Sequence, residues 1–228
     1  MRRREFVIAL AGGSSLAVLL AQSDAGAVNL TATLANVASA PDSIRIEILR
    51  WSTDEERDRL MAAWNQTSAG GGRGAEKGAG KGAAKAGRGA AKADPNPAST
   101  PDASLAKALE EAATVGYLWS SETAGYALRY AGKVDAADGS RRIVLVTQRK
   151  LGAMNARWTP TVDGTANPYE FSVIELRLNA KGEGEGKISL TGKIAPDAAA
   201  KMVSVENYAA LPAVLRDVRI RAAQTKKK

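Results

Sequence analysis

The chain of 228 residues carries 32 basic and 24 acidic side chains, which gives a formal net charge of +8 at neutral pH. It contains neither cysteine nor histidine. Disulfides, thiolate metal sites, cysteine nucleophiles and the commonest general base are therefore excluded. The length fits one ordinary domain with appendages, and the remaining residue types form no pattern that predicts a cofactor or a metal site.

The first 27 residues have the layout of a secretory signal peptide. Three arginines precede an apolar run from Phe6 to Ala21, and small residues follow it. Ala25 and Ala27 match the small-residue preference of a signal peptidase, which predicts cleavage before Val28. A retained N-terminal anchor is the alternative, but the run is shorter than the roughly 20 apolar residues of a membrane span. We expect export to the periplasm or the medium, by the Sec or the twin-arginine route, and no transmembrane segment in the mature chain.

A shift in composition over residues 67–103 predicts a disordered insertion. Residues 70–89 hold nine glycines, several prolines follow, and alanine is the only apolar residue in the stretch. Only about 40 mature residues precede the insertion, too few for a stable core without disulfides or metal. The insertion is therefore expected to interrupt a single domain over residues 28–225, which ends in a basic tail at residues 226–228.

Before the insertion, the alternation of apolar and polar residues predicts two strands followed by a helix. The strands cover residues 28–34 and 44–49, with a proline turn between them. Thr53 and Glu56 have the spacing of a capping box, so we expect a helix from Asp54 to about Asn65.

After the insertion, a second helix is expected from Pro101 to about Thr114, and strands follow. The glycine-rich stretch from Lys181 to Gly186 is interpreted as the turn of a hairpin. The expected strands lie near residues 117–119, 126–130, 141–149, 171–179, 188–190, 202–205 and 214–220. The pattern predicts an α+β fold, in which seven to nine strands form a mainly antiparallel meander. The sheet is expected to be a sandwich or a partly closed barrel, with two helices flanking the insertion.

Four aromatic residues of the strands are candidate ligand-binding residues. They are Tyr117, Trp119, Tyr126 and Tyr130, and alternation places the last two on one face with Leu128. In a barrel such a group would line a cavity for a small apolar ligand. The alternative is ordinary core and cross-strand packing.

Five cations in the insertion recur at intervals of three or four residues, namely Lys77, Lys81, Lys85, Arg88 and Lys92. A helix would gather them on one face, but the interleaved glycines oppose a helix by about 1 kcal/mol each. The segment is interpreted either as a solubilising spacer or as a loose contact with an anionic envelope polymer or lipid. No aromatic residue interleaves with the cations, so specific nucleic-acid binding is not predicted. Most of the positive charge lies in the leader, residues 70–93 and the tail, which leaves the expected domain nearly neutral.

No catalytic residue is predicted. The acidic residues 54–58 are explained by helix capping and by the helix dipole. The glycine-rich stretch near residue 184 does not have the spacing of a phosphate-binding loop. A hydrolase that uses carboxylates alone, with Glu175 as the residue to test, is kept as a second alternative function.

Several segments together resemble an uncharacterised family of short exported bacterial proteins with no assigned activity. These segments are residues 46–60 (IEILRWSTDEERDRL), 115–119 (VGYLW), 125–130 (GYALRY), 141–146 (RRIVLV), 174–178 (IELRL) and 205–208 (VENY). The resemblance covers most of residues 28–222 outside the insertion; it implies export and one domain, and it identifies no catalytic residue. The leading expectation is thus an exported, non-enzymatic binding domain. The first alternative is an envelope protein held to anionic polymer by its insertion and its tail.

Overall fold

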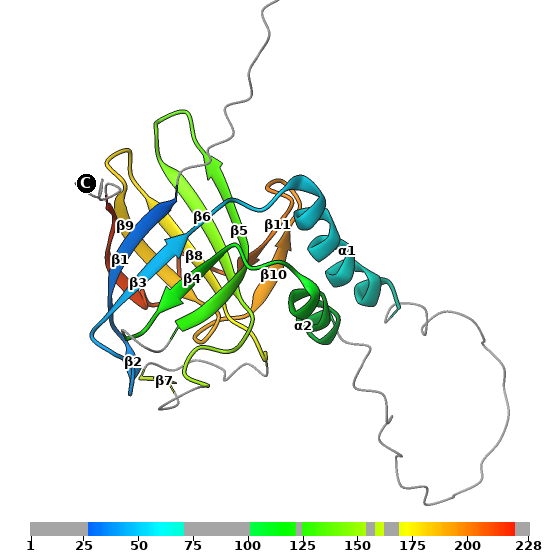
Figure 1. Ribbon diagram of the computed structural model, residues 1–228, viewed down its shortest axis with the longest axis horizontal. Coiled ribbons are helices and arrows are strands. Elements are labelled where there is room, and N and C mark those ends of the chain that lie inside the picture. The colour runs from blue at the N-terminus through cyan, green and yellow to red at the C-terminus, as the bar shows by residue number, and fades with distance from the viewer. Residues whose placement is uncertain (1–26, 71–100, 122–124, 154–157, 162–168, 222–228) are drawn as a thin grey trace, which may run out of the picture.

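Eight antiparallel strands of the computed structural model close into a barrel (Figure 1). The structure describes residues 27–70, 101–121, 125–153, 158–161 and 169–221. The barrel strands are β1 (Val28–Leu34), β3 (Ser43–Ile48), β4 (Gly116–Trp119), β5 (Gly125–Asp135), β6 (Arg141–Thr147), β8 (Val173–Leu178), β9 (Glu183–Ile188) and β12 (Leu215–Arg221). Each pairs with the next in chain order, and β12 pairs with β1 to close the barrel. The predicted mainly antiparallel α+β meander is confirmed.

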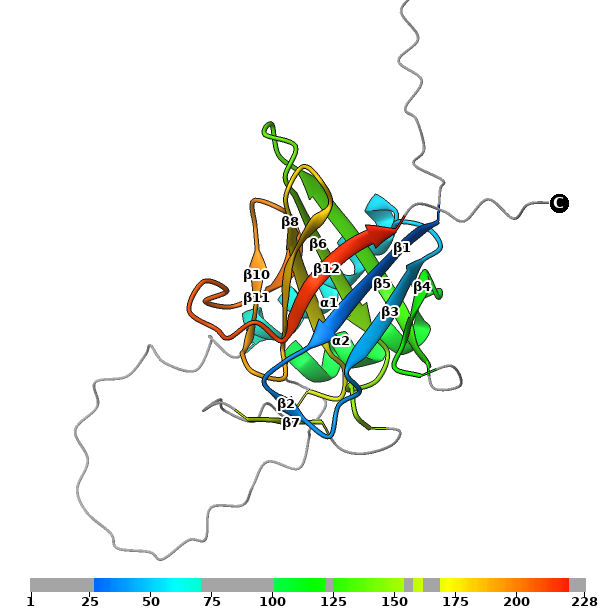
Figure 2. The same cartoon turned by 90° about the vertical axis from the view of Figure 1, so that its left-hand side faces the viewer.

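The remaining elements pack outside the barrel or at one of its ends. Helices α1 (Asp54–Gly70) and α2 (Pro101–Glu111) contact each other and β5, while β10 (Ile194–Asp197) and β11 (Met202–Val205) form a hairpin, of which β11 contacts β6 and β8. The short strands β2 (Val37–Ala38) and β7 (Thr159–Pro160) form a second small pair. Figure 2 shows the wall formed by β12, β1 and β3, with both helices behind it. We call the outer surface of β12, β1, β3 and β4 the open wall.

The inward-facing residues of the barrel form its main core. In β1 and β3 the predicted alternation is confirmed, because Leu30 and Ala32 are buried and every second residue of β3 is buried. Fully buried members include Leu30, Ile46, Leu118, Leu128, Ile143, Leu145, Ile174, Leu176, Ile188 and Leu215. An eight-stranded barrel is just wide enough for such side chains to fill it, so the core explains why this number of strands can close.

A second core lies between the outer face of β6 and β8 and the elements that cover it. Leu60 and Trp64 of α1 and Leu105 and Leu109 of α2 are buried there. They pack with residues of the barrel wall and of the β10–β11 hairpin, including Val144, Val146, Val173, Met202, Val203 and Val205. Strand β6 therefore has apolar residues on both faces from Ile143 to Val146, whereas β8 also carries Glu175 and Arg177.

A bulge in β5 changes the direction of one aromatic side chain. Leu128 pairs with Thr147, but Tyr130 pairs with Val146, so one extra residue is accommodated between them. Tyr130 therefore lies in the outer core and Ala131 in the barrel core. The sequence-based placement of Tyr126 and Tyr130 on one face is wrong for this reason.

The glycine-rich stretch from Lys181 to Gly186 is mostly strand rather than turn. The turn is confined to residues 179–182, and Gly182 has a φ of +76°; β9 then begins at Glu183. A Cβ atom on Gly184 would lie 2.0 Å from the carbonyl oxygen of Arg177, and one on Gly186 would lie 2.5 Å from Leu176 Cδ2. The glycines are thus explained by the close approach of β9 to its neighbours. A strand with several glycines has the same composition as a loop, so the sequence alone does not distinguish the two.

The predicted capping box at the start of α1 is confirmed. Glu56 N donates to Thr53 Oγ1 over 3.3 Å, and Thr53 N donates to Glu56 Oε2 over 2.9 Å. Arg50 holds the same carboxylate with two hydrogen bonds of 2.7 and 2.8 Å, and these bonds lower the pKa of Glu56. The Glu56 carboxylate in the first turn of α1 is therefore held both by the Arg50 guanidinium and by the Thr53 amide.

Replacing Thr53 with alanine should destabilise the protein by about 1 kcal/mol, because one amide of the first turn loses its acceptor. For a domain of this size, the midpoint of thermal unfolding should fall by about 2–4 °C. Thr53→Ser retains the hydroxyl and is the matched control. Equal midpoints for the alanine and serine variants would show that the cap does not contribute.

Candidate functional site

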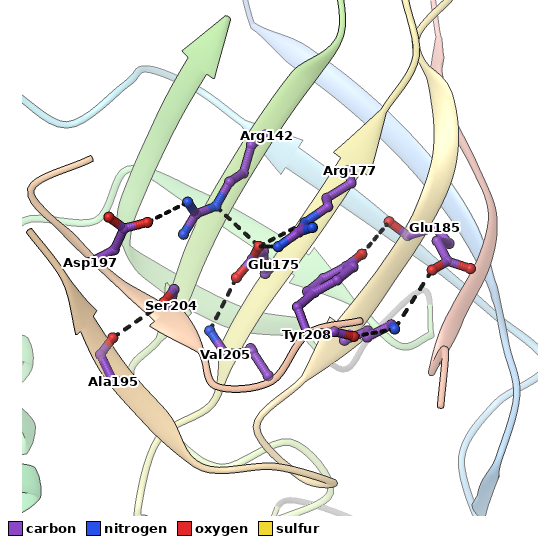
Figure 3. A network of polar contacts seen from close by, with 10 residues as sticks. Arg142, Glu175, Arg177, Glu185, Ala195, Asp197, Ser204, Val205 and Tyr208 are labelled. Atoms are coloured by element: carbon purple, nitrogen blue, oxygen red, sulfur yellow. Dashed lines mark hydrogen bonds and ion pairs between the residues drawn. The ribbon is translucent and has the colours of Figure 1, made fainter. Parts of the chain in front are cut away.

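A fully buried carboxylate, that of Glu175 on β8, lies under the β10–β11 hairpin (Figure 3). Arg142 Nε of β6 and Arg177 Nη2 of β8 lie 3.1 and 3.0 Å from its Oε1 atom. The amide of Val205 donates to Oε2 over 3.1 Å. Arg142 also donates to Asp197 of β10 over 2.6 Å, which lowers the pKa of the Asp197 carboxyl. The barrel wall and the hairpin are therefore joined at two points, by Glu175 to Val205 and by Arg142 to Asp197.

Tyr208 extends this network toward β9. Its ring lies under two cations, with Arg177 Cζ 3.8 Å and Lys187 Nζ 4.4 Å from the ring centroid. Lys187 Nζ also donates to the Tyr208 carbonyl oxygen, and the Tyr208 hydroxyl donates to the carbonyl oxygen of Glu185 over 3.3 Å. Burial raises the pKa of this hydroxyl. The turn after β11 is thus held to the barrel by cation–π contacts and hydrogen bonds.

This network holds the β10–β11 hairpin and the turn after it to the barrel, and we call it the clasp. Both oxygens of Glu175 are occupied by donors, and the side chain is completely buried. A general acid or a nucleophile must reach its substrate, and here the β10–β11 hairpin lies in between. The arrangement therefore gives no support to Glu175 as a hydrolytic residue.

A different feature, a hollow of about 660 Å³, lies on the open wall. The Trp119 ring forms part of it and lies over Gly125, where a Cβ atom would be 2.8 Å from Trp119 Cε3. Arg45 Cζ lies 5.7 Å from the centroid of the Trp119 ring. The centroids of the Tyr117 and Trp119 rings are 5.6 Å apart. Trp119 Nε1 is buried without an acceptor among the described residues, so packing rather than hydrogen bonding fixes the ring.

The other side of this hollow, here called the first hollow, is formed by a bulge in β12. Asp217 has a left-handed backbone with φ of +49°. The register of β12 shifts here against both β1 and β9. Thr33 Oγ1 donates to Asp217 Oδ2 over 3.1 Å, and Arg221 Nε donates to Thr31 Oγ1 over 3.3 Å. Strained residues and bulges that redirect a side chain are concentrated at binding sites, so Asp217 marks this hollow as a candidate site.

A second hollow of about 640 Å³ continues from the same aspartate. Asp217 is a lining residue of both hollows, and the second one extends over β9 and β8 to Arg177. Its other charged residues are Arg216, Glu183 and Glu185. The two hollows thus lie on either side of one residue, and we call them together the wall groove.

Comparison with protein-family models, with curated proteins and with solved structures gave no match. The candidate site therefore rests on the geometry of this chain. Among the described residues, no group of three or more acidic, histidine or cysteine side chains is placed to hold a metal ion. No helix within those residues is long and apolar enough to cross a membrane.

The four aromatic residues predicted to share a ligand cavity are not brought together. Tyr126 lies in the barrel core, where its hydroxyl accepts from the Gly152 amide over 2.9 Å. Tyr130 lies in the outer core beside a gap of only about 10 Å³, and burial raises its pKa to about 12. Tyr117 and Trp119 are half-buried neighbours on the open wall. Of the predicted set, Trp119 lines the first hollow.

The other predicted sites lie mainly outside the described residues. Lys77, Lys81, Lys85, Arg88 and Lys92 are outside them, as are Ala25 and the basic tail. Ala27 and Val28 are described, and Val28 is the first residue of β1.

Sequence reasoning missed Arg45, Asp217 and Thr33, although one signal for the bulge was present. Arg216 and Asp217 are consecutive exposed residues between buried Leu215 and Val218, and this break in alternation is typical of a bulge. What the sequence does not contain is the identity of the neighbouring strand on which Thr33 and Arg45 lie.

Proposed function

We propose that the protein is an exported, non-enzymatic binding domain that holds its ligand in the wall groove. The observation that carries the proposal is Asp217, a strained residue held by Thr33 at the junction of two hollows. The barrel interior is occupied by its own side chains, so the outer wall offers more room than the core. Both helices lie on the far side of the barrel, so neither of them covers the open wall (Figure 2).

Export is proposed from the leader together with the start of the barrel. Strand β1 begins at Val28, so cleavage before this residue would remove no part of the barrel. A mature chain cut at this position would keep every strand pair described here. The start of β1 is thus compatible with the proposed cleavage before Val28.

The test is co-sedimentation of the mature protein with the envelope fraction of the cells that produce it. We expect Asp217→Asn to reduce the bound fraction about tenfold while leaving stability unchanged. Asparagine tolerates the left-handed backbone and can accept the Thr33 hydrogen bond, so only the charge is lost. Thermal unfolding of the variant checks that the fold is retained.

A deletion of residues 70–93 separates this proposal from the first alternative, which is attachment through the basic insertion. Under our proposal the deletion leaves envelope binding in place. Binding that survives Asp217→Asn but disappears with the deletion, or at high salt, would instead establish attachment of an envelope protein to anionic polymer.

A further inference from the structure

The wall groove has the dimensions of a site for an extended chain molecule. From Trp119 on β4 to Arg177 on β8 the path crosses β3, β1, β12 and β9. Five strand spacings of about 4.8 Å give a contour of about 24 Å, which follows the curved wall around more than half of the barrel. Asp217 lies in the middle of this path as a residue of both hollows. A small molecule would occupy one hollow, whereas a chain of several units could occupy both.

The charges along the groove are balanced. The first hollow contains Arg45 and Arg221 together with Asp42 and Asp217. The second contains Arg177 and Arg216 together with Glu183, Glu185 and the shared Asp217. An anionic polymer would meet as many acidic as basic groups, and it would gain little from counterion release. The groove therefore fits an uncharged ligand better than nucleic acid or an acidic polymer.

The hydrogen-bonding groups of the groove favour hydroxyl groups as partners. A guanidinium group only donates and an ionised carboxylate only accepts, whereas a hydroxyl group does both. One hydroxyl-rich ligand can therefore satisfy Arg45 and Asp217 in turn. The hydroxyls of Thr31, Thr33 and Ser43 line the same hollow and add partners of both kinds.

Trp119 supplies the apolar surface that a sugar ring requires. The ring is held in place by Gly125 and by the neighbouring Tyr117 and Arg45 side chains. An aromatic side chain combines a large apolar surface with low conformational entropy, and it can pack on the C–H face of a pyranose. Nucleic-acid grooves instead combine a series of stacking aromatics with net positive charge.

We propose that the ligand of the wall groove is a neutral sugar chain laid across the strands from β4 to β8. This inference rests on the proposed function and adds the chemical class of the ligand. Trp119 packs on one sugar ring, and the arginine, aspartate and threonine side chains bind hydroxyl groups on either side of it. Arg216 binds a later unit of the same chain in the second hollow.

Calorimetric titration of the mature protein with neutral hexasaccharides tests the inference. The probes are hexamers of β-linked glucose, xylose and N-acetylglucosamine, with each monosaccharide measured alongside. We expect at least one hexamer to bind about tenfold or more tightly than its monosaccharide, because only the chain spans both hollows. Raising the salt concentration from 50 to 500 mM should leave the affinity within about twofold, because no net charge is paired.

Three variants locate the chain on the wall. Trp119→Ala should weaken hexamer binding about tenfold or more, and Trp119→Phe, which retains a ring, should recover part of it. Arg216→Ala should weaken the hexamer while leaving monosaccharide binding unchanged. Lys107→Ala, an exposed cation on α2 behind the barrel, is the matched control and should have no effect. Thermal unfolding of each variant distinguishes loss of binding from loss of fold.

Either of two kinds of result overturns the inference: a preference for a polyanion, or hexamer binding that is absent or independent of Trp119. One is tighter binding to heparin or to an oligonucleotide than to every neutral hexamer. The other is no hexamer binding at millimolar concentration, or hexamer binding that Trp119→Ala leaves unchanged. If the sugars fail while envelope binding is still lost in Asp217→Asn, the sugar inference falls and the proposed function stands. If Asp217→Asn also binds the envelope normally, both fall.

Discussion

Replacing Glu175 with alanine should lower the free energy of unfolding by about 3–5 kcal/mol, the range measured when one partner of a buried ion pair is removed. The carboxylate is completely buried and accepts from Arg177 and from the amide of Val205, with Arg142 also 3.1 Å away. Without it, two guanidinium groups face each other across β6 and β8, and a buried amide loses its acceptor. Urea unfolding of the purified mature protein measures the loss.

Glu175→Gln is the matched control, because it retains the size of the side chain and an oxygen for the Val205 amide. We expect a smaller loss of about 1–3 kcal/mol from the missing charge. Hydrogen exchange at residues 202–205 should rise more in the alanine variant than in the glutamine variant, because this carboxylate fastens the β10–β11 hairpin to the barrel. An alanine variant within 1 kcal/mol of the parent protein would show that the clasp does not contribute to stability.

Replacing Gly184 with alanine should destabilise the protein by about 3 kcal/mol, at the upper end of the range for overpacking. The new methyl group would lie 2.0 Å from the carbonyl oxygen of Arg177, which is backbone and is part of the β8–β9 ladder. Relief of the clash requires β9 to move away from β8, and this separation would weaken the pairing that keeps the barrel closed. The midpoint of urea unfolding measures the effect.

Gly192→Ala provides the comparison. A methyl group there would also be close, 2.4 Å from a neighbouring atom, but this atom is Cδ1 at the end of the half-buried Leu211 side chain. A flexible side chain can rotate away, so we expect a loss below about 1 kcal/mol. Equal losses in the two variants would contradict the explanation of Gly184 by close approach of two strands.

Local patterns predicted the elements well where one periodicity applied to the whole element. Alternation located β1 and β3, and the spacing of Thr53 and Glu56 located the first residue of α1. The pattern failed at Gly184 and at Tyr130. A glycine-rich strand such as β9 has the composition expected of a turn. A bulge such as the one before Tyr130 moves every later side chain of the strand to the opposite face of the sheet.

Such local patterns could not predict the candidate site, because its residues come from different strands. Arg45, Trp119 and Asp217 come from three strands that are far apart in sequence, and each is unremarkable in its own segment. Trp119 was identified as a candidate ligand residue, but it was grouped with Tyr126 and Tyr130, which lie in the two cores, as well as with its neighbour Tyr117. Only the order of the strands around the barrel shows which side chains share a surface.

The sequence by itself excluded disulfides and indicated the antiparallel succession of strands, and it predicts the leader and the insertion, because each of these depends on composition or on neighbours along the chain. The tertiary structure decided that β12 pairs with β1, and thus that the sheet closes. It also decided that the apolar residues of β6 and β8 serve two cores and that the first hollow lies on the open wall. These features depend on pairing between segments nearly 190 residues apart, which side-chain packing and backbone hydrogen bonds settle only when the whole barrel forms.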